Sequence, residues 1–132
     1  MPGSATILCI EDEAEMIDLM RLMLEREGYR VIGAEGGEAG LERIREEVPD
    51  LVLLDLMMPG VDGWQVYQHL QTDQAFEDIP VIVVTAKAQD IDKVLGLRIA
   101  QVADYIVKPF GAQQLLESIR RVLGEGGPEG EP

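Results

Sequence analysis

The chain has 132 residues, of which 46% are apolar, and this is sufficient for one domain with a substantial buried core. Asp and Glu number 25 against 11 Lys and Arg, and the net charge of −14 argues against direct binding of nucleic acids or anionic membranes, which leaves a metal ion or a basic protein surface as the more natural partner. Cys9 is the only cysteine, no signal-peptide pattern precedes it, and no apolar run approaches the ~18 residues of a membrane span, so a soluble cytoplasmic protein is expected.

The first half of the chain alternates strand and helix patterns. In chain order, the patterns predict a strand at residues 7–10, a helix at 16–27, a strand at 29–34, a helix at 36–47 and a strand at 51–55. Gly28 and Pro49 follow the two helices as stop signals. The run Leu51-Val52-Leu53-Leu54 has no polar residue before Asp55, and this is typical of a strand buried on both faces.

The second half continues the alternation. The patterns predict a helix at residues 63–73, a strand at 81–85, a helix at 90–100, a strand at 105–107 and a helix at 111–123. Five strand-helix units with short loops predict a doubly wound α/β fold, a three-layer α/β/α sandwich, over residues 1–123. Residues 124–132 contain no apolar side chain and are expected to be disordered, as a free tail or the start of a linker.

Acidic residues stand where two of the predicted strands end. Glu11 and Asp12 follow the first strand, and Asp55 ends the third. Because the carboxyl ends of neighbouring parallel strands meet at one edge of a sheet, we expect these carboxylates to converge there. They would repel one another unless a cation lay among them, and an all-oxygen set of ligands favours Mg²⁺. Asp55, beside such an ion, could act as a nucleophile toward a phosphoryl group.

Two further strand ends supply groups that phosphoryl transfer needs. Thr85 offers a hydroxyl and Lys108 offers a cation, and both could neutralise phosphoryl oxygens as charge develops. Each residue alone also has a structural interpretation: Thr85 could cap a turn, Lys108 could be a solvated loop residue, and Glu11 and Asp12 could belong to the acidic first turn of a helix. Their combination is what favours a functional site.

These residues and their order resemble the receiver domain of two-component response regulators. The resemblance rests on four motifs: Glu11-Asp12-Glu13, Asp55-Leu56-Met57-Met58-Pro59-Gly60 with Asp62-Gly63, Thr85-Ala86, and Asp104-Tyr105 with Lys108-Pro109-Phe110. It implies a flavodoxin-like (CheY-like) fold whose parallel strands have the order 2-1-3-4-5. It also implies phosphorylation of Asp55 by a sensor histidine kinase or a histidine phosphotransfer protein.

The resemblance implies a role for each acid at the predicted site. Asp12, Asp55 and the backbone carbonyl of Met57 are expected to bind Mg²⁺ directly. Glu11 stands where the family usually has Asp and is expected to act through a metal-bound water.

The resemblance also implies the parts of a switch. The Thr85 hydroxyl is expected to move toward the phosphoryl group, the ring of Tyr105 to follow it, and Lys108 to pair with the acyl phosphate. The bond between Lys108 and Pro109 is expected to be cis.

The output face expected from the family is formed by residues 90–100, 105–107 and 111–123. The chain departs from the usual pattern near this face, because it reads Gln101-Val102-Ala103-Asp104-Tyr105 where the family often has Gly-Ala-Asp-Asp-Tyr. Ser118 also stands where regulators that pair through this face often have arginine. We therefore expect a monomer or a phosphorylation-dependent dimer, which acts on an effector domain or a downstream protein.

Two other functions are compatible with parts of the pattern. An aspartate-nucleophile phosphohydrolase of the haloacid dehalogenase type would need an Asp-x-Asp pair after the first strand, but Asp55 is followed by Leu56 and Met57. A flavodoxin-like cofactor carrier would need a loop rich in Ser, Thr and Gly where this chain has acids. The receiver interpretation predicts no enzyme with a separate substrate, only self-phosphorylation and self-dephosphorylation.

Overall fold

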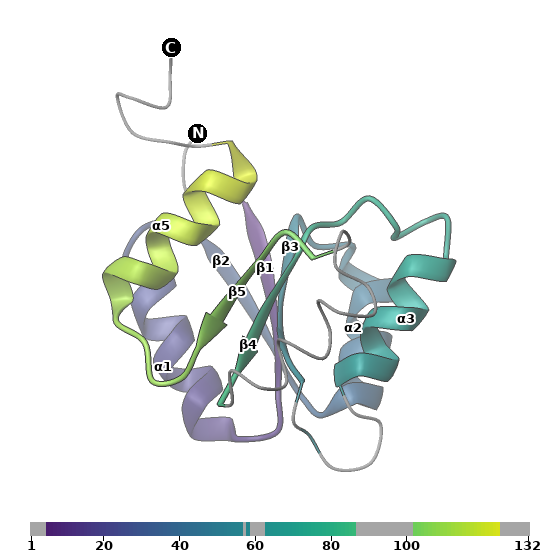
Figure 1. The fold of residues 1–132 in the computed structure, drawn as a ribbon, viewed down its shortest axis with the longest axis horizontal. Coiled ribbons are helices and arrows are strands. Elements are labelled where there is room, and N and C mark those ends of the chain that lie inside the picture. Colours follow the sequence, from purple (N-terminus) through teal and green to yellow (C-terminus); the bar gives the residue numbers. More distant parts are fainter. Residues whose placement is uncertain (1–4, 57, 59–62, 87–101, 125–132) are drawn as a thin grey trace.

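The computed structural model describes residues 5–56, 58, 63–86 and 102–124, and places one sheet between two layers of helices (Figure 1). The strands are β1 (Thr6–Glu11), β2 (Arg30–Glu35), β3 (Leu51–Asp55), β4 (Val81–Thr85) and β5 (Asp104–Val107). The helices are α1 (Ala14–Glu25), α2 (Gly37–Glu47), α3 (Gly63–Thr72) and α5 (Ala112–Leu123). The helix predicted at 90–100 lies outside the described residues.

All the strand pairs are parallel, and their order is β2-β1-β3-β4-β5. Helices α1 and α5 lie on one face of this sheet, and α2 and α3 lie on the other (Figure 1). The predicted three-layer fold and strand order are therefore confirmed.

Alternation along the buried strands divides the core into two clusters. In β3, Leu51 and Leu53 pack with residues of α1 and α5, whereas Val52 and Leu54 pack with residues of α2 and α3. Both sets are buried because helices cover both faces of the sheet. This explains why the sequence shows a continuous apolar run here instead of an alternating one.

Helix ends in the structure differ slightly from those that the stop signals predict. Gly28 has a φ of 95° after α1, as a helix-terminating glycine would. Tyr29 still donates its N–H to the carbonyl of Leu24, so β2 begins one residue later than predicted, at Arg30. At the end of α2, Val48 adopts the left-handed conformation, with a φ of 42°, immediately before Pro49.

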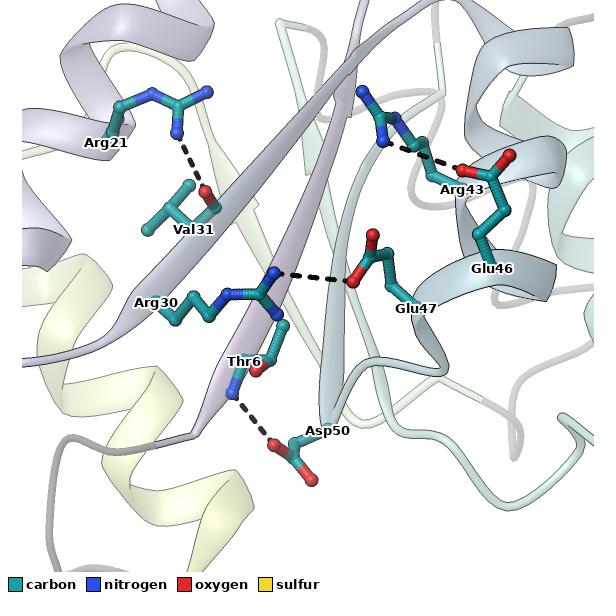
Figure 2. A network of polar contacts seen from close by, with 8 residues as sticks. All are labelled: Thr6, Arg21, Arg30, Val31, Arg43, Glu46, Glu47 and Asp50. Carbon is teal, nitrogen blue, oxygen red and sulfur yellow. Dashed lines mark hydrogen bonds and ion pairs between the residues drawn. The ribbon is translucent and has the colours of Figure 1, made fainter.

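Polar contacts tie the chain together near the amino ends of β1, β2 and β3 (Figure 2). The N–H of Thr6 donates to the Asp50 carboxylate at 2.8 Å, and Arg30 approaches Glu47 at 3.4 Å. Arg21 of α1 donates to the Val31 carbonyl at 2.7 Å, on the edge strand of the sheet. The carboxyl ends of the strands lie at the opposite end of the sheet, where Glu11, Asp55 and Thr85 are the last residues of β1, β3 and β4.

Candidate functional site

The pairing of the strands brings the acidic residues to one level of the sheet. Ile10 of β1 pairs with Leu54 of β3, so the next residues, Glu11 and Asp55, end adjacent strands side by side. Asp55 in turn pairs with Val84 of β4. The buried apolar runs therefore fix the position of Asp55 at the end of the middle strand.

The same alternation that divides the core decides which face each site residue takes. Glu11 and Asp55 follow Cys9 and Leu53 by two residues, and so belong to the face that α1 and α5 cover. Thr85 follows Val83 by two residues and belongs to the opposite face. The hydroxyl and the two buried acids thus come from different faces of the same sheet edge.

The described residues contain one group of acids that could hold a metal ion, formed by Glu11, Asp12 and Asp55. One carboxylate oxygen from each lies within 4.8 Å of the others. Glu11 and Asp55 are buried, whereas Asp12, just beyond the end of β1, is exposed. The cluster can therefore be reached from solvent through Asp12.

Lys108 lies among these acids. Its Nζ is 2.9 Å from Oε1 of Glu11 and 3.5 Å from Oδ2 of Asp55. Its backbone N–H donates to the carbonyl of Thr85 at 2.8 Å, which fixes the residue beyond the end of β5. The bond between Lys108 and Pro109 is cis, as the resemblance implied.

The electrostatics of the site depend on burial and on the Lys108 contacts. Burial raises the pKa of Glu11 from 4.5 to about 7; the hydrogen bond from Lys108 opposes the rise, and the nearby Asp55 adds to it. Burial alone would lower the pKa of Lys108, but its contacts with Glu11 and Asp55 outweigh burial and raise the pKa above its usual value. Lys108 therefore remains a cation at neutral pH.

One oxygen of the cluster shows whether these residues fit a cation. Oε2 of Glu11 is buried and has no hydrogen-bond donor among the described residues. A buried carboxylate oxygen is costly without a partner, and a metal ion or a water bound to it would supply one. The donor set, three carboxylates within 4.8 Å, is of the kind that Mg²⁺ or Ca²⁺ takes. The residues present therefore fit a divalent cation.

Of the remaining predicted residues, the structure describes Thr85 and Tyr105 but not Met57. Thr85 is buried at the end of β4, and Tyr105 on β5 is 46% exposed. Met57, whose carbonyl was predicted as a ligand, is outside the described residues. His69, at the end of α3, is exposed and has no part in the cluster.

Sequence reasoning missed the role of Gly63, the first residue of α3. Its N–H approaches the Leu56 carbonyl at 3.3 Å, and a Cβ at this position would lie 2.1 Å from the carbonyl oxygen of Asp55. Glycine therefore allows α3 to begin in contact with the backbone that carries the acid. The sequence signal for this close contact was a glycine, Gly63, at the point where the turn-rich segment meets the predicted helix.

A family model described as the response regulator receiver domain matches residues 7–120 of the chain. Protein PilH of Pseudomonas aeruginosa is 41% identical over 119 residues, which cover 90% of this chain and 98% of PilH. Transcriptional regulatory protein AfsQ1 of Streptomyces coelicolor is 43% identical over 122 residues, which cover 92% of this chain and 52% of AfsQ1. The chain thus spans about half the length of AfsQ1 and of several other curated relatives.

The chain is also similar to solved structures of other proteins. The N-terminal domain of a response regulator receiver protein from Methanoculleus marisnigri is 42% identical, with a TM-score of 0.71 over 90% of this chain and 96% of that one. A sensor protein from Polaromonas is 25% identical, with a TM-score of 0.83 over 90% of this chain and 95% of that one. No helix in the described part of the chain is long and apolar enough to cross a membrane. Because the family match extends from β1 into α5, the chain belongs to the receiver domain family of two-component response regulators.

Proposed function

We propose that Asp55 is the phosphoacceptor of this receiver domain. The observation that carries the proposal is the surroundings of Asp55, which is buried at the end of the middle strand, shares an acidic cluster with Glu11 and Asp12, and lies 3.5 Å from the Lys108 ammonium ion. Membership of the family implies a histidine kinase as partner. A sensor histidine kinase or a histidine phosphotransfer protein would supply the phosphoryl group to Asp55.

In the proposed reaction, a carboxylate oxygen of Asp55 attacks the phosphorus of a phosphohistidine. The new O–P bond forms while the P–N bond breaks, and the released imidazole nitrogen keeps the electron pair and takes up a proton. Phosphoryl transfer needs positioning and charge compensation more than covalent help from the protein. The Lys108 ammonium ion supplies a fixed positive charge next to the attacking carboxylate, and Thr85 supplies a hydroxyl at the same edge of the sheet.

The divalent cation that fits the acidic cluster is proposed to be Mg²⁺. Asp12 and Asp55 would be direct ligands together with the backbone carbonyl of Met57, and Glu11 would act through a water. When bound, Mg²⁺ compensates negative charge on the phosphoryl oxygens. Without it, the excess of carboxylates over Lys108 would repel an incoming phosphoryl group.

Thr85 and Tyr105 are proposed to report the phosphorylated state. The Thr85 hydroxyl would move toward the phosphoryl group, and the half-exposed ring of Tyr105 on β5 would follow. The change would reach the face formed by residues 90–100, β5 and α5. An effector domain or a downstream protein would bind there, in a monomer or a phosphorylation-dependent dimer, without direct contact with nucleic acid or a membrane.

The receiver unit is proposed to occupy residues 1–123, with residues 124–132 as a tail or the start of a linker. A cytoplasmic location is proposed because Cys9 is a buried free thiol and because the partner implied by the family is a histidine kinase. A receiver domain is not an enzyme that turns over a separate substrate, so the phosphohydrolase alternative is not carried further.

Labelling with acetyl phosphate tests the proposed function. In the presence of Mg²⁺ the chain should gain one phosphoryl group by intact-mass measurement, and EDTA should prevent this. Asp55→Asn should abolish the gain, whereas Asp78→Asn, an exposed acid in the segment between α3 and β4, should retain it. Labelling that survives in Asp55→Asn would overturn the assignment.

A further inference from the structure

We propose that Glu11 is a positioning residue: its carboxylate is the closer partner of the Lys108 ammonium ion, so that Lys108 competes less with a divalent cation for Asp55. This inference rests on the proposed function, because it concerns how the same site is kept ready. It assigns to Glu11 a contact with the protein itself, in addition to any contact with a metal-bound water.

The ammonium ion of Lys108 lies closer to Glu11 than to Asp55. Its Nζ is 2.9 Å from Glu11 Oε1 but 3.5 Å from Asp55 Oδ2. The shorter distance is that of a charge-assisted hydrogen bond, and the longer one is at the limit of a hydrogen bond. Glu11 is therefore the main partner of the ammonium ion, although Asp55 is equally buried.

The two carboxylate oxygens of Glu11 have different surroundings. Oε1 accepts the hydrogen bond from Lys108, while Oε2 is buried with no donor among the described residues. The same carboxylate also has an oxygen within 4.8 Å of oxygens from Asp12 and Asp55. Glu11 can thus face Lys108 with one oxygen and the cation position with its carboxylate at the same time.

The contact with Lys108 depends on the length of the Glu11 side chain. Aspartate at this position would be shorter by one methylene, about 1.5 Å. The hydrogen bond from the Lys108 backbone N–H to the Thr85 carbonyl fixes the point from which the side chain reaches the cluster, so a shorter acid lengthens its contact with the ammonium ion unless Nζ moves. In Glu11→Asp its ammonium ion would turn to the nearest remaining carboxylate, Asp55, and would compete there with a divalent cation.

A double-mutant cycle on Mg²⁺ binding tests the inference. Binding is followed by the fluorescence of Trp64, which follows Gly63 next to the Asp55 backbone. Lys108→Met should raise the Mg²⁺ affinity more in the Glu11→Asp background than in the original chain, on the order of tenfold more. Glu11→Asp keeps the charge of the site, so loss of a carboxylate cannot produce this difference. Equal effects of Lys108→Met in both backgrounds would overturn the inference.

A second measurement in the absence of metal separates this inference from the proposed function. The ¹⁵N resonance of Lys108 Nζ should shift more in Glu11→Gln than in Asp55→Asn, because Glu11 is the closer partner. In the Glu11→Asp background, the further change Asp55→Asn should shift the resonance strongly. If the chain bound no Mg²⁺, the proposed function would fail while this comparison still decided the inference. A resonance that responds to Asp55→Asn and not to Glu11→Gln would refute it.

Discussion

The contact between Gly63 and the strand that carries Asp55 predicts a large effect from adding a single methyl group. In Gly63→Ala the new Cβ would lie 2.1 Å from the carbonyl oxygen of Asp55 and 2.6 Å from Cα of Leu56. Both are backbone atoms, so neither can rotate away as a side chain could. The first turn of α3 would have to move from β3 by roughly 1 Å to restore normal contact, in an interior that is otherwise close-packed.

The size of the effect follows from two opposing contributions. Overpacking of this kind typically lowers the free energy of unfolding by about 1–3 kcal/mol. Alanine favours a helix over glycine by up to about 1 kcal/mol, and less at the first helical residue. We therefore expect Gly63→Ala to lower the free energy of unfolding by about 1–2 kcal/mol, measured by urea denaturation followed by circular dichroism.

Gly111 provides the matched control for this prediction. It precedes α5 with a φ of −94°, and nothing lies within 4 Å of a Cβ built there. Gly111→Ala should change the free energy of unfolding by less than about 1 kcal/mol, because alanine restricts the unfolded chain but is a poorer N-cap of α5 than glycine. Equal stability of Gly63→Ala and Gly111→Ala would refute the argument from backbone contact.

Three further predictions concern Val48, Cys9 and the binding of Mg²⁺ at the acidic cluster. Val48→Gly should raise the free energy of unfolding by about 1 kcal/mol in urea denaturation, because Val48 has a φ of 42° and its side chain is largely exposed; a loss of stability would contradict this. Burial raises the pKa of Cys9 to about 12, so the thiol should resist iodoacetamide at pH 8 until urea unfolds the chain, and its titration should lower stability only as pH rises from 9 toward 12. Prompt labelling of the folded protein at pH 8 would contradict the burial of Cys9. Mg²⁺ at 100 times its Kd should raise the free energy of unfolding by about 2.7 kcal/mol in thermal or urea denaturation, and the increase should disappear with EDTA or in Asp12→Asn.

The alternation of strands and helices could be predicted from the sequence because burial leaves a direct pattern. The run Leu51-Val52-Leu53-Leu54 is apolar at every position because helices cover both faces of the sheet. Asp55 is the first charge after it, and a charge at the end of such a strand must lie at an edge of the sheet. The order of the strands, which places Asp55 next to Glu11, 44 residues away in the sequence, was implied by the resemblance to receiver domains and not by the apolar pattern.

The pairing of Lys108 could not be predicted from the sequence. Glu11 and Lys108 are 97 residues apart, and both acids at the site can reach the ammonium ion. Which acid is closer depends on one methylene group and on the position that the Thr85 carbonyl gives the lysine backbone. No periodicity or motif records a difference of this size.

The hydrogen bond of Ser118 could not be predicted from the sequence either. From the sequence, Ser118 was notable only because regulators that pair through this face often have arginine there. In the structure its hydroxyl donates to the Asp104 carboxylate at 2.5 Å, and Arg121 forms an ion pair with the same carboxylate. Asp104 at the start of β5 is therefore neutralised within the chain by α5, which a pattern of apolar residues along α5 could not reveal.

The balance of charge at the site separates a functional interpretation from a structural one. A buried ion pair that only stabilises a fold would match each charge with an opposite one, because unpaired buried charge is destabilising. Here two buried acids, Glu11 and Asp55, both contact the Lys108 ammonium ion, and burial raises the pKa of Glu11 to about 7. Carboxylates gathered in this way are costly to bury, and a cation bound beside Asp12 would offset that cost. The arrangement is therefore better explained by binding and phosphoryl transfer than by stability.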